Sequence, residues 1–240
     1  MKPTNLNKQW TIFPDAATVA QESCELIKHA ANHAIEKKGL FRIVLAGGTT
    51  PGQIYQLLAK ENYDWSKWEF FLGDERCLPI DSAERNSQMA MNTWLNHINV
   101  PNENIYFIPS EYGAEQAAKE YAQTIKNKLP FDMVLLGMGE DGHTASLFPG
   151  HKHNEHELTH SVHNAPKPPA DRVSLSASTL SNSINVMMIV TGKGKRESVQ
   201  SWLNGEALPI AQISTLKNLT VILDEAACNS VNNKTAKESN

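Results

Sequence analysis

The amino-acid sequence predicts an α/β fold, namely an open and mostly parallel sheet flanked by helices. Short apolar runs of strand length recur along the 240 residues, and segments with an apolar residue at every third or fourth position lie between them. The apolar runs are nearly continuous, which is typical of strands buried on both faces in parallel sheets covered by helices. The succession of strands and helices therefore favours a parallel α/β architecture.

The first helix is the best defined of the expected elements. Asp15 supplies an N-cap, apolar residues follow at helical spacing, and Gly39 ends the helix. Further helices are expected near 51–60, 84–98, 113–128 and 194–204. Strands are expected at Phe41–Ala46, Trp68–Leu72, Asn104–Ile108, Met133–Leu136, Ile184–Val190 and Leu219–Leu223.

Length and composition describe an ordinary globular chain. Residues 1–240 fit one large domain, and 22 basic against 26 acidic residues give a net charge of −4, which argues against a nucleic-acid or membrane-surface binder. Three cysteines without a paired spacing favour a reducing, cytoplasmic location, and no apolar stretch reaches the roughly 18 residues of a membrane span. A polar stretch at about 150–169 is expected to be a surface loop or lid, and the tail after about 229 to be frayed.

A glycine-rich turn follows the first expected strand. Gly47 and Gly48 allow a ligand to approach the backbone closely. Thr49 or Thr50 offers a cap hydroxyl, and Pro51 suits the first turn of the following helix. Free N–H groups and the helix dipole would then face an anion such as a phosphate. The spacing is neither a dinucleotide fingerprint nor a P-loop, and a tight turn without any ligand fits it equally well.

A charged segment follows the expected strand Trp68–Leu72. Asp74, Glu75 and Arg76 lie at the carboxyl end of that strand, where open α/β sheets bind their ligands. Two acids and an arginine at this place would serve as a base, an orienting group and an anion clamp. An exposed turn with a solvated charge cluster is the alternative interpretation.

A third loop, from Gly137 to Gly150, surrounds one histidine with glycines. His143 is the side chain best suited to general-base chemistry near neutral pH, and either Glu140 or Asp141 would fix its tautomer. This loop also follows an expected strand, so it lies at the same edge of the sheet as the other two loops. That position favours a catalytic role for His143 over a purely structural one.

Two further features resemble reactive sites but lack the context that such sites need. The sequence H-E-x-x-H at 156–160 matches a zinc-protease pattern, yet few apolar residues are available to anchor the helix that the pattern requires. Cys77 beside Arg76 has no partner pattern for an activated thiol and is expected to be a buried small hydrophobe. We therefore expect no metal site and no cysteine nucleophile.

The three loops, together with two later segments, resemble the 6-phosphogluconolactonase family. The matching segments are AGGTTP (46–51), FFLGDERCLP (70–79) with its continuation ERNS (84–87), LLGMGEDGHTASLFPG (135–150), NAPKPPADRVSLS (164–176) and TGKGKRESVQSWLNG (191–205). They occur in the order and spacing of the family and spread over about residues 40 to 205. The resemblance implies the Rossmann-like sheet that this family shares with glucosamine-6-phosphate deaminases.

The resemblance also implies an activity, which is the hydrolysis of 6-phospho-D-glucono-1,5-lactone to 6-phospho-D-gluconate in the oxidative pentose phosphate pathway. It implies no metal and no organic cofactor, and a small sugar-phosphate lactone as the partner. The residues implied to seat the substrate phosphate are Gly47, Gly48, Thr49, Arg76, Arg172 and Lys195. Backbone N–H donors, guanidinium groups and an ammonium group complement a phosphate dianion. Either a monomer or a small homo-oligomer is compatible with the sequence.

The catalytic candidates are His143, Asp74 and Asp141. We expect neutral His143 to take a proton from water as the water attacks the lactone carbonyl. Arg76 or backbone N–H groups of a glycine loop would stabilise the oxyanion that forms. Asp74 would orient the water or the substrate hydroxyls.

Two other functions remain as alternatives. A deaminase-like enzyme would match at Asp74, Asp141 and His143, but such enzymes carry a carboxylate just before the Pro-Gly pair, where this chain has Phe148. A non-catalytic sugar-phosphate sensor would usually carry a DNA-binding module, and the sequence indicates neither an added helix-turn-helix nor a basic stripe. The lactonase is therefore the favoured function.

Overall fold

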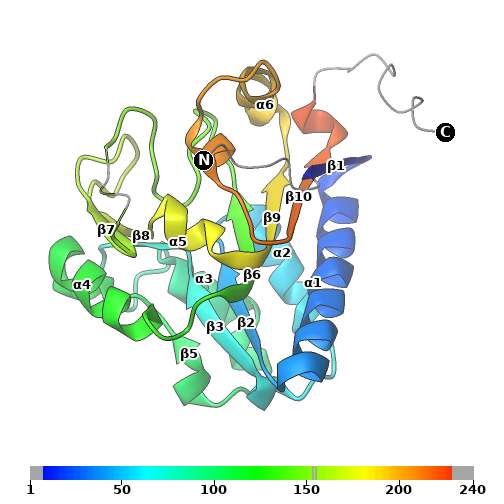
Figure 1. Cartoon of the computed structure of the whole chain (residues 1–240), viewed down its shortest axis with the longest axis vertical. Helices are drawn as coiled ribbons and strands as arrows, with labels where there is room; N and C mark the ends of the chain where they lie inside the picture. Colours follow the sequence, from blue (N-terminus) through cyan, green and yellow to red (C-terminus); the bar gives the residue numbers. More distant parts are fainter. Residues whose placement is uncertain (1–7, 153, 155, 229–240) are drawn as a thin grey trace.

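The computed structural model describes residues 8–152, 154 and 156–228, and its centre is a seven-stranded sheet (Figure 1). The strand order is β1-β10-β9-β6-β2-β3-β5, and every neighbouring pair is parallel. The strands are β1 Lys8–Phe13, β2 Phe41–Leu45, β3 Trp68–Leu72, β5 Ile105–Tyr106, β6 Phe131–Gly137, β9 Ser183–Val190 and β10 Asn218–Asp224. The predicted open, parallel sheet is therefore confirmed. The tail expected to be frayed after about 229 lies outside the described residues.

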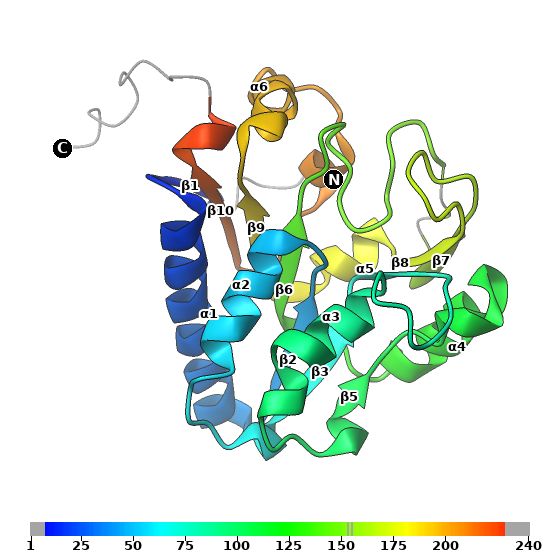
Figure 2. The same ribbon diagram turned by 180° about the vertical axis from the view of Figure 1, so that it is seen from behind.

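Helices cover both faces of this sheet. The described α-helices are α1 Ala16–Lys38, α2 Thr49–Leu58, α3 Asn86–Thr93, α4 Ala114–Ile125, α5 Ala177–Ser181 and α6 Arg196–Leu203. Figure 2 shows α1, α2 and α3 side by side on one face, and α5 lies on the opposite face in Figure 1. Among the helices so described, none is both long enough and apolar enough to cross a lipid bilayer.

Helix α1 forms where the sequence predicts it. The Asp15 carboxylate accepts a hydrogen bond of 2.8 Å from the Thr18 N–H, and Gly39 adopts the left-handed conformation (φ 77°) and donates its N–H to the Ile35 carbonyl. The residues that α1 buries are Val19, Ala20, Ser23, Cys24, Ile27, Ala31 and Ala34. Their spacing of three and four residues makes one apolar stripe that packs on the sheet.

A second, small antiparallel sheet was not expected. Its strands are β4 Asp74–Arg76, β8 Arg172–Leu175 and β7 Thr159–Val162, in the order β4-β8-β7. The charged segment after β3 is thus a strand instead of a plain turn, and the expected loop or lid at about 150–169 contains β7. These strands are only three or four residues long, and their hydrogen-bond partners are distant in the sequence, so hydrophobic periodicity does not reveal them.

Strand β1 was also missed, because the beginning of the chain reads as polar. β1 lies at the edge of the large sheet and pairs only with β10. From Gln9 to Phe13 no side chain is fully buried, and Ile12 is exposed. An edge strand that buries little apolar surface needs no apolar run, so the signal used for the central strands is absent there.

The order of the strands produces a switch point at the centre of the sheet. From β2 the chain proceeds outward through β3 to β5, returns to β6 on the other side of β2, and then proceeds outward through β9 to β10. The loops after β2 and β6 therefore diverge to opposite sides and leave a crevice at the carboxyl ends of these strands. Ligands of open α/β sheets bind in this kind of crevice.

Candidate active site

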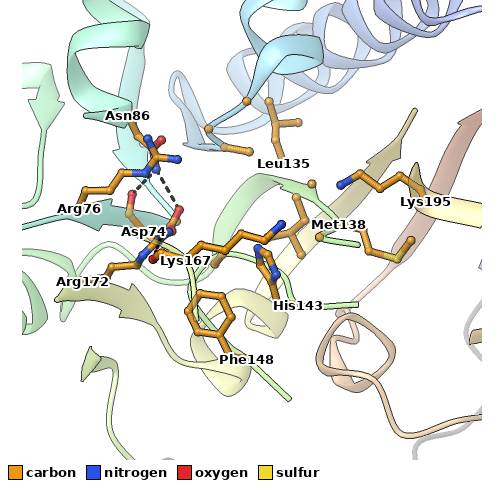
Figure 3. Close-up of a pocket in the computed structure, with 18 of the residues that line it drawn as sticks. Asp74, Arg76, Asn86, Leu135, Met138, His143, Phe148, Lys167, Arg172 and Lys195 are labelled. Carbon is orange, nitrogen blue, oxygen red and sulfur yellow. Dashed lines mark hydrogen bonds between the residues drawn. The ribbon is translucent and has the colours of Figure 1, made fainter. Parts of the chain in front are cut away.

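A cavity of about 310 Å³ opens at the carboxyl ends of β2, β3 and β6 (Figure 3). Its walls are Ala46, Gly47, Gly48, Gly73, Asp74, Arg76, Asn86, Leu135, Leu136, Gly137, Met138, Gly139, His143, Ala145, Phe148, Lys167, Pro168, Arg172 and Lys195. Seven of the nine candidate residues are among them, namely Gly47, Gly48, Asp74, Arg76, His143, Arg172 and Lys195. The three loops predicted to share one sheet edge thus converge on one cavity at the switch point.

His143 is held by the aspartate two residues before it. Its Nδ1 lies 2.5 Å from Asp141 Oδ1, and its backbone N–H donates to the same oxygen at 3.2 Å. A Cβ on Gly139 would lie 2.0 Å from Nδ1, so only glycine leaves room for the ring at this place. Asp141 does not line the cavity itself, but it fixes the histidine with Nδ1 as the donor. The lone pair of the neutral ring is therefore on Nε2.

The surroundings of His143 keep its ring neutral at pH 7. Burial lowers the pKa of His143 and outweighs the nearby Asp141 and Asp74 carboxylates, which raise it, while Lys167 lowers it further. Phe148 packs 4.7 Å from the imidazole, measured between ring centroids. For Asp141, burial raises the pKa, but the hydrogen bonds and charge of His143 prevail, so the net shift is downward and the carboxylate is ionised.

Asp74 is buried at the start of β4 and is held by two neighbours. Asn86 Nδ2 donates to its Oδ1 at 3.0 Å (Figure 3). Ser146 Oγ donates to its Oδ2 at 2.6 Å, so both carboxylate oxygens are oriented. A Cβ on Gly47 would lie 2.1 Å from Asn86 Oδ1. The glycine turn after β2 is therefore needed to make room for the side chain that holds Asp74.

Arg76 lines the cavity and has one buried donor that no group among the described residues satisfies. Its Nη1 donates to the Glu84 carbonyl, which fixes the guanidinium group. Its Nε is buried and has no hydrogen-bond partner among the described residues. A buried donor that lacks a partner is costly, and an oxygen of a bound ligand would satisfy it.

Arg172 uses most of its donors within the protein. It begins β8 opposite Arg76 in the small sheet and is almost fully buried. Nε donates to the Pro169 carbonyl at 3.2 Å, and Nη2 donates to the carbonyls of Lys167 at 2.9 Å and Pro168 at 3.0 Å. Its guanidinium group therefore both lines the cavity and supports the loop before β8.

Two lysines reach the cavity from opposite loops. Lys195 is the N-cap residue of α6, and Lys167 comes from the loop before β8 (Figure 3). Burial lowers the pKa of Lys195, and the nearby Glu140 carboxylate partly offsets this effect. Glu140 Oε2 also lies 3.4 Å from Lys167 Nζ. The cavity thus holds two ammonium groups in addition to its two guanidinium groups.

The glycine turn begins α2 without a threonine cap. Gly48 (φ 111°) is the N-cap residue, and no side chain caps the helix. The expectation that Thr49 or Thr50 supplies the cap hydroxyl is therefore wrong. Thr49 lies in a neighbouring shallow groove, and Thr50 Oγ1 lies 2.6 Å from Thr191 Oγ1, which ties the start of α2 to the segment that carries Lys195. Without a side-chain cap, the first N–H groups of α2 stay available to an anion.

Sequence reasoning missed Lys167 and Asn86 as cavity residues, although both belong to segments that match the family, and it considered Phe148 only as the residue that replaces a deaminase carboxylate. Asn86 lies in α3 and acts through Asp74, and Phe148 packs on His143. Lys167 was overlooked because it belongs to a loop that no periodic pattern places. The signal that could have found it is a lysine five residues before Arg172 in a Pro-rich segment next to β8.

The segment H-E-x-x-H is not a helix. Strand β7 begins at Thr159, and His160 is buried within it. No group of three or more His, Cys, Asp or Glu side chains in residues 8–152, 154 and 156–228 is arranged to hold a metal ion. Cys77 is half-buried, and burial raises the pKa of its thiol to about 11, which keeps the sulfur protonated.

Known proteins resemble this chain over most of its length. The family model described as glucosamine-6-phosphate isomerases/6-phosphogluconolactonase matches residues 14–222. A curated relative, probable 6-phosphogluconolactonase 2 of Arabidopsis thaliana, is 34% identical over 230 residues, which are 85% of this chain and 89% of that protein. The chloroplastic 6-phosphogluconolactonase 3 of the same plant is 32% identical over 80% of this chain, and the match spans 66% of its own length.

Solved structures of proteins with these names have a fold similar to that of this chain. The crystal structure of 6-phosphogluconolactonase from Thermotoga maritima superimposes with a TM-score of 0.86 at 27% identity, covering 91% of this chain and all of that chain. A monomeric glucosamine-6-phosphate deaminase superimposes with a TM-score of 0.78 at 21% identity, which shows a shared fold only. The family model covers residues 14–222, and the Arabidopsis relative matches over most of its own length as well as most of this chain. The chain therefore belongs to the family of glucosamine-6-phosphate isomerases and 6-phosphogluconolactonases.

Proposed function

We propose that this protein is a 6-phosphogluconolactonase, which hydrolyses 6-phospho-D-glucono-1,5-lactone to 6-phospho-D-gluconate. The observation that carries the proposal is a neutral histidine, oriented by Asp141, in a cavity that also presents cationic side chains. A histidine that is neutral at pH 7 serves as a general base for water, and the cations complement a sugar phosphate. The curated relatives carry the same name.

The proposed reaction begins with deprotonation of water at His143 Nε2. The water oxygen attacks the lactone carbonyl carbon, and the carbonyl π electrons move to oxygen to form a tetrahedral oxyanion. The oxyanion collapses, the bond between the carbonyl carbon and the ring oxygen breaks, and the imidazolium returns its proton to that oxygen. Asp141 stabilises the imidazolium between these two steps, as expected from its hydrogen bond to Nδ1.

Arg76 and Asp74 are proposed to act on the substrate around the histidine. The unpartnered Nε of Arg76 would donate to an oxygen that gains negative charge, because a fixed donor in a buried place stabilises developing charge strongly. The oriented Asp74 carboxylate would accept hydrogen bonds from substrate hydroxyls or from the attacking water. Gly47, Gly48 and Lys195 would seat the phosphate, with the start of α2 as a source of free N–H donors.

The neighbour of His143 favours hydrolysis over deamination. Phe148 occupies the place where the deaminases that this chain resembles carry a carboxylate, and its ring packs 4.7 Å from the imidazole. An apolar ring supports a neutral histidine and supplies no acid to assist ring opening of an amino sugar. Hydrolysis needs a base that activates water and groups that bind the phosphate, and the cavity contains His143 for the first role and cationic side chains for the second.

The decisive experiment measures the initial hydrolysis rate of freshly generated 6-phosphogluconolactone after EDTA treatment. Because the lactone opens spontaneously, only the excess over the background without protein counts. We expect a large excess that EDTA does not reduce. The His143→Ala variant is expected to lower kcat by about 10² to 10⁴ with little change in KM, as is usual for loss of a general base.

Other outcomes would redirect the assignment. If the wild-type protein does not raise the rate of lactone hydrolysis above the background but releases ammonia from glucosamine-6-phosphate, the deaminase function replaces the lactonase function. Binding of the phosphosugar without turnover would identify a sensor. A His143→Ala variant with nearly full kcat would remove the histidine from its proposed role.

The place of this activity in the cell is also part of the proposal. Opening of the lactone suits the oxidative pentose phosphate pathway, and residues 1–240 are proposed to form a single lactonase domain. The sequence favours the cytoplasm, whereas several similar plant proteins are named chloroplastic. Fractionation of the source cells with antibodies against the protein tests the compartment.

A further inference from the structure

The loop at residues 163–171 carries a lysine into the cavity and is held from beneath by an arginine. Arg172 donates three hydrogen bonds, of 2.9 to 3.2 Å, to three successive carbonyls of this loop, those of Lys167, Pro168 and Pro169. The guanidinium group is therefore enclosed by the tip of the loop. A planar group with several fixed donors suits this arrangement, because it meets several acceptors at once.

The base of the same loop is anchored separately. The Ala165 N–H donates to the Ala170 carbonyl at 2.9 Å and closes the loop, and the Cys77 N–H donates to the Asp171 carbonyl at 3.0 Å. His163 Nδ1 lies 2.8 Å from Asp171 Oδ1, and His163 Nε2 lies 2.8 Å from Glu115 Oε1 in α4, so this side chain joins the loop to α4. Arg172 is therefore the group that acts on the tip of the loop, whereas other contacts hold the base.

The Lys167 side chain extends from this tip toward His143 (Figure 3). Among the described residues its ammonium group forms an ion pair with Glu140 Oε2 at 3.4 Å, and both side chains are more than half exposed, at 52% and 63%. An exposed ion pair at this distance contributes little to holding a lysine in place. The position of the ammonium group thus depends on the backbone of the loop, and so on Arg172.

We propose that Arg172 is a positioning residue whose guanidinium group shapes the 163–171 loop, and that Lys167 contacts the substrate phosphate in addition to Lys195. This inference rests on the proposed lactonase function and goes beyond it, because it moves the phosphate contact from the arginine to the lysine. Arg172 has Nε and Nη2 engaged with carbonyls, whereas Lys167 has only an exposed carboxylate as a competitor for a dianion.

The test is a double-mutant cycle with Lys167→Met, Arg172→Lys and the combined variant. Arg172→Lys keeps the positive charge, but a single ammonium group cannot reproduce the fork that meets three carbonyls. If the arginine acts through the lysine, each single variant raises KM about 10-fold, the scale of one charge-assisted hydrogen bond, with kcat changed less than 3-fold. The combined variant then equals Lys167→Met.

A matched control separates this effect from a general loss of positive charge. Lys193 is exposed, lies two residues before Lys195 and does not line the cavity, so Lys193→Met is expected to leave KM unchanged. Thermal unfolding of every variant is measured first. If Arg172→Lys does not fold at the assay temperature, Arg172→Gln takes its place in the cycle, and the expectation of non-additivity is the same.

A pH profile supplies a readout that a purely structural role would not move. The charged groups that act on His143 are Asp141 on its own loop, Asp74 from β4 and Lys167 from the 163–171 loop, and the lysine lowers the pKa of the histidine. Lys167→Met is therefore expected to shift the acid limb of kcat/KM to higher pH. Arg172→Lys is expected to shift it in the same direction, and the combined variant no further.

The outcomes are distinguishable from failure of the proposed function. If the wild-type protein hydrolyses the lactone and the two losses multiply to about 100-fold in the combined variant, the arginine contacts the substrate on its own and the inference is overturned. If the wild-type protein has no lactonase activity, the proposed function fails, and the same cycle is read from the Kd of 6-phosphogluconate by calorimetry. Additive losses in Kd would overturn the inference there as well.

Discussion

The imidazole of His143 lies among groups that move its pKa in opposite directions. Burial, which includes the contact with Phe148, lowers the pKa below the usual 6.5, and the Asp141 and Asp74 carboxylates raise it by a smaller amount. The pKa therefore stays below its usual value. A lowered pKa means that the ring loses its proton at lower pH, so the acid limb of the kcat/KM profile is expected below pH 6.5.

Replacement of Asp141 with Asn tests the origin of this balance. The carboxylate stabilises the imidazolium, so its removal is expected to lower the pKa of His143 and to move the acid limb to still lower pH. We expect kcat to fall by about 10², because the ring is no longer fixed with Nδ1 as the donor. Stopped assays between pH 4 and 9 measure both effects, and a shift of the acid limb to higher pH would contradict the assignment.

Lys195 is expected to act on binding and to have little effect on the chemical step. Its ammonium group lines the cavity beside the start of α2, where a phosphate would sit. Lys195→Met is expected to raise KM for the phosphorylated lactone about 10-fold or more with kcat nearly unchanged, because a charge-assisted contact is lost in ground state and transition state alike. Lys193→Met again provides the neighbouring control. An unaltered KM would place the phosphate elsewhere.

The residue type and its position after a predicted strand were enough to predict His143 and Asp74 as site residues. Both follow buried strands directly, so the predicted sheet edge brings them together. Lys167 and Asn86 have no such signal, since their positions depend on a loop before β8 and on the start of α3. Whether Arg172 faces a ligand or a carbonyl is decided by contacts that no local pattern records.

The connection between β4 and α3 depends on one buried carboxylate. Glu75 is fully buried and accepts hydrogen bonds from the backbone N–H groups of Arg76 at 2.9 Å, Asn86 at 2.7 Å and Ser87 at 2.8 Å. Arg85 Nε lies 3.5 Å from it. Glu75 therefore joins the strand that carries Asp74 to the first turn of α3, where a negative charge also interacts favourably with the helix dipole.

Glu75→Gln is expected to lower the free energy of unfolding by about 3 kcal/mol, because it removes one of the two carboxylates paired with buried Arg85, the other being Glu111, and turns an amide donor toward backbone N–H groups. Urea unfolding at pH 7 measures this change. Glu22→Gln, on the exposed face of α1, is the matched control and should change the free energy by less than about 0.5 kcal/mol. A loss of less than 1 kcal/mol in Glu75→Gln would show that water replaces the missing contacts.

The elements that could be predicted are those whose signals lie within their own sequence and do not depend on the strand or helix that packs beside them. Helix α1 has its cap, its apolar stripe and its terminating glycine within its own sequence, and β3 is a buried run that begins and ends as expected. Strands β1 and β7 lack such internal signals. β1 needs β10 beside it, and β7 needs β8, so both depend on residues far along the chain.

The site as a whole occupies the switch point between β2 and β6. Loops from both halves of the sheet and from the small sheet meet there, and polar contacts such as those between Thr50 and Thr191 and between Ser146 and Asp74 join them. A ligand that contacts several of these loops would add further links between them. Binding is therefore expected to stabilise the native state as a unit.

Thermal unfolding with the reaction product measures this linkage. At 100 times its Kd, 6-phosphogluconate is expected to contribute about 2.7 kcal/mol and to raise Tm by roughly 5–10 °C for a chain of this size. Gluconate, which lacks the phosphate, is expected to raise Tm much less at the same concentration. Equal shifts for the two compounds would show that the cationic side chains of the cavity do not recognise the phosphate.

Local patterns in the chain were sufficient for the parallel sheet, the capped first helix and the convergence of three loops on one edge, because each depends on residues close together in sequence. The small antiparallel sheet, the second lysine in the cavity and the enclosure of Arg172 by its own loop required the folded molecule. The physical reason is that these features are hydrogen bonds and packing contacts between distant segments. Hydrophobic periodicity reports which face of an element is buried, and it contains no information about which distant partner covers that face.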